Sequence, residues 1–192
     1  MTDPYKCLNL PLTATLMEVE KSRFQLIEEI EEDGYGPGNL KYREIIWSAE
    51  LLKDRERRAG YEKVILSSAL NNVKGLEVDD LRVSLLDELK PVLTIDQYLA
   101  IINEDVSGVD FSFCFFSIDE HMDAGRMLAA FLTLLQVHGA VSDDDLKPRI
   151  LFKISDFFSR RLGNRTWEKV FLKKLIKEYP KSREALRAED LL

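Results

Sequence analysis

Cysteine and histidine are scarce in this sequence. Its 192 residues include two cysteines, Cys7 and Cys114, and two histidines, His121 and His138, with no Cys-x-x-Cys pair. A disulfide framework or a thiolate-bound metal is therefore not expected. Both cysteines lie in apolar stretches, so we expect them to be buried as small hydrophobic side chains.

Long apolar runs are missing as well. The most apolar stretches, near 111–116 and 127–137, are too short or too interrupted to span a bilayer. The first five residues, Met1 to Tyr5, contain no basic segment followed by an apolar one, so a signal peptide is not expected. We therefore expect no membrane span and a reducing, cytoplasmic location.

The familiar motifs of catalysis and nucleotide binding are also absent: there is no Gly-x-Ser-x-Gly, Walker, dinucleotide-binding, His-Glu-x-x-His or EF-hand pattern. The glycines of residues 34–38 do not form a phosphate-binding loop, because Pro37 lacks an N–H and no strand precedes them. His121 has acidic neighbours, but acids are favoured at a helix start, and adjacent residues point to different sides of a helix. We expect these side chains on the surface, and hence no catalytic residue, metal or cofactor. An enzyme built around His121 stays open as a less favoured hypothesis, which requires these groups to converge in a pocket.

What the sequence does contain is helical patterning. It is 45% apolar and 32% charged, which is enough for a buried core and typical of helices with solvated faces. Capping boxes at Thr15, Thr94 and Ser117 mark three helix starts. Residues 111–116 alternate only in part, so with no partner strand we favour a buried turn or a helix start. The sequence predicts an all-α fold with helices near residues 15–33, 42–52, 61–65, 79–89, 95–103, 117–138, 148–163 and 167–176, and a short tail helix after Pro180.

Glycine, proline and asparagine mark the breaks between these helices. Residues 34–38 form a loop, Gly139 is expected to be the left-handed residue that ends the helix at His138, and Gly163 ends the next helix. Pro91 ends helix 79–89, and Asn71, Asn72 and Gly75 mark a further interruption. We expect an N-terminal domain at 1–66, a linker at 67–75 and a helical C-terminal domain at 76–192.

The first third of the chain resembles a J domain. Residues 3–11, Asp-Pro-Tyr-Lys-Cys-Leu-Asn-Leu-Pro, are similar to the opening pattern D-Y-Y-x-x-L-G-V of that family. Residues 42–54 resemble its pattern F-x-x-I-x-x-A-Y-x-x-L-x-D, and they continue without a gap into Arg57-Arg-Ala-Gly-Tyr-Glu62, which is similar to x-R-x-x-Y-D. The resemblance covers residues 3 to about 65. It implies an antiparallel helical hairpin closed at its ends by Tyr5, Leu8 and Tyr61, with facing apolar side chains at Leu26, Ile27, Ile30, Ile45, Ala49 and Leu52.

The resemblance fails where J domains carry their activity. In that family a His-Pro-Asp tripeptide in the hairpin loop couples to a DnaK-type chaperone and stimulates ATP hydrolysis; here those positions fall on Glu31-Glu32-Asp33. The second helix of the family is usually basic, whereas residues 16–33 hold seven acids against two basic residues. In the family the basic helix matches an acidic surface of the chaperone, so an acidic helix here would repel that surface. Conventional stimulation of the chaperone ATPase is therefore not expected. The acidic helix and loop become a candidate partner-binding surface, made of Glu28, Glu29, Glu31, Glu32 and Asp33.

Charge is divided unevenly along the chain. Residues 147–187 contain 13 Lys or Arg and 4 Asp or Glu, a net charge of +9, so the remainder carries −16 to give the total of −7. The negative total argues mildly against a general nucleic-acid binder. The basic residues are either solvated helix faces or a surface for an acidic partner, which would be a protein, RNA, a membrane surface or the chain's own acidic part. The candidate basic residues are Arg160, Arg161, Arg165, Lys169, Lys173, Lys174 and Lys177, with Trp167 and Phe171 among them as further contacts.

Together these observations predict a non-catalytic protein–protein interaction or adaptor protein. Its degenerate J-like domain would make it a co-chaperone-like regulator that does not stimulate chaperone ATPase. The alternative is binding of nucleic acid or another acidic partner through the basic C-terminal helices.

Overall fold

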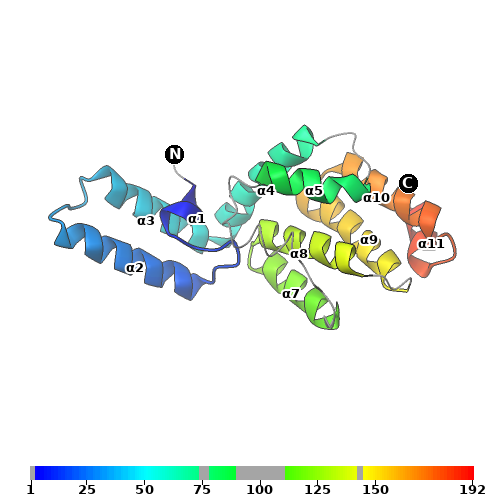
Figure 1. Cartoon of the computed structure of the whole chain (residues 1–192), viewed down its shortest axis with the longest axis horizontal. Helices are drawn as coiled ribbons and strands as arrows, with labels where there is room; N and C mark the ends of the chain where they lie inside the picture. Colours follow the sequence, from blue (N-terminus) through cyan, green and yellow to red (C-terminus); the bar gives the residue numbers. More distant parts are fainter. Residues whose placement is uncertain (1–2, 74–77, 90–110, 142–144) are drawn as a thin grey trace.

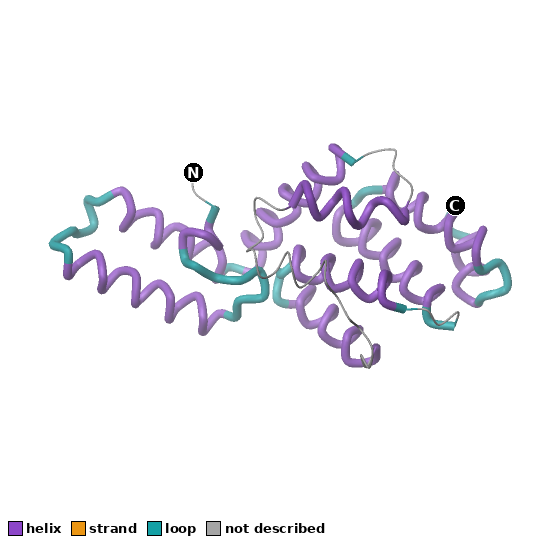
Figure 2. The backbone as a smooth tube through the Cα atoms, in the orientation of Figure 1, coloured by secondary structure: helices purple, strands orange, loops and turns teal. Residues whose placement is uncertain are grey.

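The computed structural model of the chain describes residues 3–73, 78–89, 111–141 and 145–192. All regular structure in these ranges is helical, which confirms the all-α prediction (Figures 1 and 2). None of the helices in them is long and apolar enough to cross a membrane. The elements are α1 (Pro4–Cys7), α2 (Leu16–Glu32), α3 (Leu40–Lys53), α4 (Arg55–Asn72), α5 (Val78–Leu89), α7 (Phe111–Asp123), α8 (Met127–Ala140), α9 (Lys147–Asp156), the π-helical η1 (Phe157–Leu162), α10 (Arg165–Glu178) and α11 (Arg183–Glu189).

Helices α2 and α3 form an antiparallel pair that projects from the rest of the molecule (Figure 1). The predicted capping box starts α2: the Glu18 N–H donates to Thr15 Oγ1 at 3.3 Å, and the Thr15 N–H donates to the Glu18 carboxylate at 2.7 Å. Ile45 and Ala49 are buried between the helices as expected. Leu16 and Phe24 follow the same apolar pattern, yet they are exposed. Periodicity therefore identified the helix but not all of its buried face.

Helix α4 joins this hairpin to the other helices. The Asp54 carboxylate caps its first turn, accepting hydrogen bonds from the N–H groups of Glu56 and Arg57. The helix then runs without interruption to Asn72, so the short helix predicted at 61–65 is only its middle part. Its final turns also occupy residues 67–72 of the predicted linker. Helix α4 packs against α3 on one side and against α5 and α8 on the other. The division of the chain into two domains stays a prediction.

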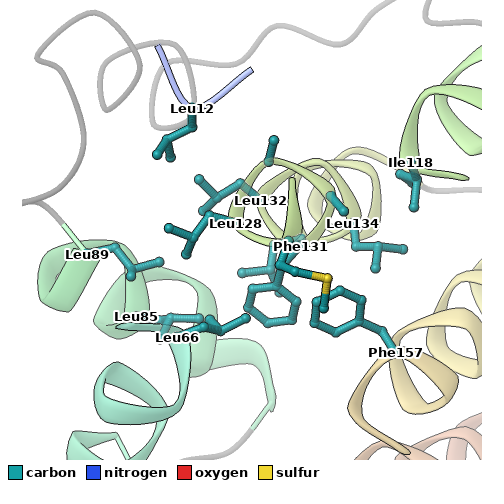
Figure 3. Close-up of a cluster of buried hydrophobic side chains, with 14 of the residues drawn as sticks. Leu12, Leu66, Leu85, Leu89, Ile118, Leu128, Phe131, Leu132, Leu134 and Phe157 are labelled. Atoms are coloured by element: carbon teal, nitrogen blue, oxygen red, sulfur yellow. The ribbon is translucent and has the colours of Figure 1, made fainter. Parts of the chain in front are cut away.

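The central helix of the larger bundle is α8. It is apolar on nearly all sides, as expected for a helix surrounded by others. Figure 3 shows Leu66 of α4 and Leu85 of α5 near Leu128 and Phe131 of α8. The Phe131 ring stacks on Phe157 of η1, with 5.2 Å between ring centroids. Four helical segments thus share one core.

The helix predicted at 117–138 is wrong in its start and its continuity. Helix α7 already begins at Phe111, so Ser117 lies inside the helix and is not a cap. Of the two alternatives for residues 111–116, a buried turn or a helix start, the structure has the helix start. A break at Gly125, whose φ is +75°, then separates α7 from α8. Gly139 does not adopt the left-handed conformation, and α8 ends at Ala140 with Val141 extended.

The remaining helices follow their sequence signals more closely. Helix α5 spans the segment predicted at 79–89, and Pro148 lies in the first turn of α9. The helix ends at Gly163, as predicted, and Gly163 adopts the left-handed conformation there, at φ +66°. The short tail helix after Pro180 is α11. The helix expected at 95–103, its capping box at Thr94 and the stop at Pro91 lie outside the described residues.

The two glycines beside the α4–α8 contact should respond to alanine in opposite ways. A Cβ at Gly125 would lie 2.5 Å from the Arg55 carbonyl oxygen, and the left-handed conformation adds about 1 kcal/mol of strain, so Gly125→Ala should lower the free energy of unfolding by more than about 1 kcal/mol. A Cβ at Gly60, inside α4, meets nothing within 4 Å, so Gly60→Ala should raise it by about 0.5–1 kcal/mol. Urea unfolding of the two variants measures both effects. If the two substitutions change the free energy of unfolding by the same amount, the α7–α8 turn does not lie close against α4.

Candidate functional site

A fully buried arginine lies where the hairpin meets the bundle. Arg58 of α4 is 2% exposed. Its Nε donates to Tyr5 Oη at 2.9 Å and to Glu62 Oε1 at 3.2 Å. Its two terminal nitrogens donate to the carbonyl oxygens of Ala14 and Leu12, each at 2.8 Å. Because a buried guanidinium stays charged, acceptors at all three of its nitrogens are what allow it to be buried here.

Glu62, one turn further along α4, links the arginine to the bundle. Its carboxylate accepts hydrogen bonds from Tyr5 Oη, from Arg58 and from the backbone N–H of Leu128 at 2.7 Å. Leu128 lies in the first turn of α8, where free N–H groups and the helix dipole favour an anion. Burial raises the pKa of Glu62, and these donors and the arginine charge act against that rise. Burial also raises the pKa of the Tyr5 hydroxyl, which therefore stays a donor.

A second arginine holds the same loop from the other side. Arg126 precedes α8; its Nη1 donates to the Thr13 carbonyl oxygen at 2.9 Å, and its Nη2 lies 3.3 Å from a Glu120 carboxylate oxygen. Three consecutive carbonyl groups, those of Leu12, Thr13 and Ala14, thus accept hydrogen bonds from two arginines of different elements. The loop between α1 and α2 is therefore tied to both α4 and the α7–α8 turn.

Sequence reasoning did not identify this buried network, although a signal for it was present. Arg58 and Glu62 are four residues apart, in phase with Leu66 and Ala69, which are buried on the same face of α4. Two charges in register with an apolar stripe indicate a buried pair. Similarity to the J-domain pattern had drawn attention to the motif but not to its burial.

Breaking the buried pair should destabilise the whole chain. Arg58→Met removes the positive charge beside Glu62 and one of its three donors, and it takes the arginine donors from the carbonyl groups of Leu12 and Ala14, so the free energy of unfolding should fall by about 3–5 kcal/mol. The neighbouring Arg57→Met removes an exposed side chain and should change it by less than about 0.5 kcal/mol. Urea unfolding measures both. A small loss at Arg58 would mean that its hydrogen bonds are replaced by water.

His121 departs from the expectation of a surface side chain. It is half-buried on α7, and its Nδ1 has no hydrogen-bond partner in the described part of the chain. Burial, followed by the charge of nearby Arg126, lowers the pKa of its imidazole, while Glu120 acts in the opposite direction. Among the described residues no cluster of three His, Cys, Asp or Glu side chains could hold a metal ion. The two cysteines, expected to be buried, are only partly buried.

The lowered pKa of His121 predicts a loss of stability in acid. Below the ordinary value of about 6.5 the unfolded chain takes up this proton more readily than the folded chain does. The contribution of neutral His121 is therefore present above that pH and is lost as the pH falls below it. The free energy of unfolding in urea should fall less between about pH 7.5 and about pH 5.5 for His121→Gln than for the unchanged chain. His138→Gln is the matched control. Its free energy of unfolding should still include the loss between about pH 7.5 and about pH 5.5 that protonation of His121 causes.

The predicted acidic surface lies at the free end of the hairpin, away from the bundle (Figure 1). All five of its carboxylates are exposed, and none forms an ion pair with a described residue. Two large apolar side chains at this end are exposed too, Tyr35 by 56% and Leu40 by 69%, and Phe24, in the middle of α2 and one turn before Glu28, is exposed by 64%. The acidic tip, as we call this surface, is Glu28, Glu29, Glu31, Glu32 and Asp33.

The seven predicted basic residues do not behave as one set. Four form ion pairs: Arg160 with Asp156 at 2.6 Å, Arg161 with Asp123 at 3.9 Å, Arg165 with Glu168 at 2.7 Å, and Lys174 with Glu178 at 2.8 Å. The other three, Lys169, Lys173 and Lys177, lie at four-residue spacing along α10 and are exposed.

Trp167 and Phe171 are not surface contacts, contrary to the interpretation of the sequence. Both are buried, and both rings stack against Phe158 of η1, with centroids 6.0 and 5.4 Å apart. Their helical spacing was compatible with either a core or a docking face, and the neighbouring η1 decides for the core.

Comparison with protein-family models, curated proteins and solved structures found no match to the chain. The candidate surfaces are therefore argued from their own geometry and charge.

Proposed function

We propose that the chain is a non-catalytic interaction or adaptor protein whose acidic tip binds a basic segment of a partner protein. The observation that carries the proposal is the set of five exposed carboxylates without ion partners in the described chain, beside an exposed Phe24. Unpaired charges of one sign attract and orient a partner of the opposite sign. The adjacent exposed aromatic ring supplies apolar area, which is where binding energy concentrates in interfaces.

The outer face of α2 suggests the shape of that partner. Met17, Phe24, Glu28 and Glu31 follow each other at seven, four and three residues, so they share one side of the helix, and all four are exposed. Along this stripe the two apolar side chains come first and the two acidic ones follow, and the exposed Lys21 lies between Met17 and Phe24. The partner that complements this stripe is an amphipathic segment, with basic residues beside apolar ones.

The resemblance to J domains supports a role beside a chaperone system. The pattern over residues 3–65 and the antiparallel pairing of α2 with α3 agree with that reading. Glu31-Glu32-Asp33 stands in place of the active tripeptide, and the acidic tip reverses the usual charge. We therefore propose a co-chaperone-like regulator that does not stimulate the ATPase of a DnaK-type chaperone.

Reversing the charge of the tip should abolish partner capture. In a quantitative pull-down from the native source, the variant with Glu28, Glu29, Glu31 and Glu32 changed to Lys should lose its specific partner by at least about tenfold. The matched control changes Glu50, Glu88, Glu189 and Asp190 to Lys, an equal change of net charge at exposed positions elsewhere. It should retain the partner.

Two results would contradict this function. If the control loses the partner as strongly as the tip variant, net charge rather than the tip is responsible. If the purified chain accelerates a DnaK-type ATPase as strongly as a true J protein, the regulatory role is wrong.

A second candidate function is supported by the exposed lysine stripe on α10. Lys169, Lys173 and Lys177 form no ion pair with a described residue, and they suit an acidic partner such as RNA. A labelled RNA should then bind at low salt and be released steeply as salt rises, and changing the three lysines to Glu should remove binding. Absence of binding at low salt would eliminate this function.

A further inference from the structure

A cleft of about 510 Å³ opens between α4, the α7–α8 turn and η1. Four cationic side chains line it: Arg55 and Lys63 from α4, and Arg160 and Arg161 from η1. The one acidic residue among its lining side chains is Glu56, so the lining carries a net charge of +3. Residues about 100 positions apart in the sequence are thus combined into a basic site, which periodicity and local charge could not reveal.

These cations are available to a ligand. Arg55 and Lys63 are exposed and form no ion pair with a described residue. Arg160 is paired with Asp156, but its side chain is 77% exposed, and such surface pairs contribute little. Arg161 lies 3.9 Å from Asp123, at the outer limit of an ion pair. Binding an anion here therefore breaks no strong interaction.

Gly60 gives an independent indication that a ligand approaches the α4 side of the cleft. It lies inside α4, where glycine costs about 1 kcal/mol relative to alanine. Packing does not require it, because a Cβ there would meet nothing within 4 Å, and its φ is not left-handed. Because Gly60 lines the cleft and has no side chain, the backbone of α4 is accessible from the cleft between Arg55 and Lys63. A missing side chain of this kind allows a ligand to come close.

The π-helical turn of η1 explains how the two arginines reach the cleft together. Phe157, Phe158 and Leu162 are buried, so the wider turn leaves the intervening residues on the outer side. The consecutive residues Arg160 and Arg161 are therefore both exposed, on a segment whose apolar side chains are packed in the core. Irregular turns of this kind recur at functional sites.

We propose that this cleft binds a phosphate monoester whose organic part lies against Met122 and Met127. The guanidinium fork matches phosphate oxygens, and a dianion with three terminal oxygens can use several of the four cations, more than a single carboxylate can. The two methionines supply an adaptable apolar wall. The volume lies within the range of ligand sites. The site shares no residue with the acidic tip, so it is independent of the function proposed above.

Calorimetric titration of the full chain at low salt tests the site with three small probes. Phenyl phosphate should bind at least about tenfold more tightly than benzoate, which has the ring but a single charge, and more tightly than inorganic phosphate, which has no apolar part. A phosphoserine peptide with a flanking leucine tests the other source of the same group. Tighter binding of the peptide than of phenyl phosphate assigns the site to a phosphorylated partner, and the reverse assigns it to a small organic phosphate.

Variants separate the cleft from general surface charge. Changing Arg160 and Arg161 to Gln should weaken phenyl phosphate binding by at least about tenfold, and changing Lys169 and Lys173 to Gln should leave it within about twofold. Gly60→Leu should place a side chain in the cleft beside α4 and also weaken phenyl phosphate binding by about tenfold. Leucine is a better helix former than glycine, so the chain should stay folded.

Three outcomes would overturn the proposal. The first is no binding of phenyl phosphate or of the phosphopeptide at about 10 mM. The second is benzoate binding as tightly as phenyl phosphate. The third is an equal loss in the Lys169 and Lys173 variant, which would mean that net charge alone attracts the probes.

Discussion

The buried guanidinium of Arg58 is the constraint on which the arrangement of this chain depends. An arginine cannot give up its charge, so it can be buried only where acceptors surround it. Here the acceptors come from α1, from the loop before α2 and from α4 itself, and Glu62 extends the network to the first turn of α8. Replacing such networks by apolar groups often costs little stability. We therefore regard this one chiefly as a device that selects a single packing.

Helix α4 carries this constraint and also forms the boundary of the cleft. One face contributes Arg58 and Glu62 to the interior, and another presents Arg55 and Lys63 to solvent. The close approach of Gly125 to the Arg55 carbonyl group places the α7–α8 turn against the first turn of α4. The hydrogen bonds that hold the hairpin to the bundle therefore also determine the position of one cleft wall.

Opposite charges are kept apart in this molecule. The acidic tip lies at the free end of the hairpin, and the α10 lysine stripe lies on the bundle, so the two do not neutralise each other within one chain (Figure 1). The sequence had left self-pairing open as one use of the basic residues. Because neither surface has an ionic partner in the described residues, each stays available for another molecule.

The sequence by itself determined the helical class, most helix positions and the acidic character of α2, because these depend on neighbouring residues along the chain. Local signals were reliable where a residue acts on its own turn, through its side chain at Thr15 and through its backbone at Gly163. They failed where another element decides: Ser117 is not a cap because the helix begins upstream, and Gly125 adopts a left-handed conformation between α7 and α8, where the nearby Arg55 carbonyl group leaves no room for a Cβ. Burial followed the same rule, since Phe24 and Phe171 have similar patterns but only Phe171 is covered by another helix. The Arg58 network and the basic cleft were decided only by the tertiary structure, because their groups come from distant segments that folding alone brings together.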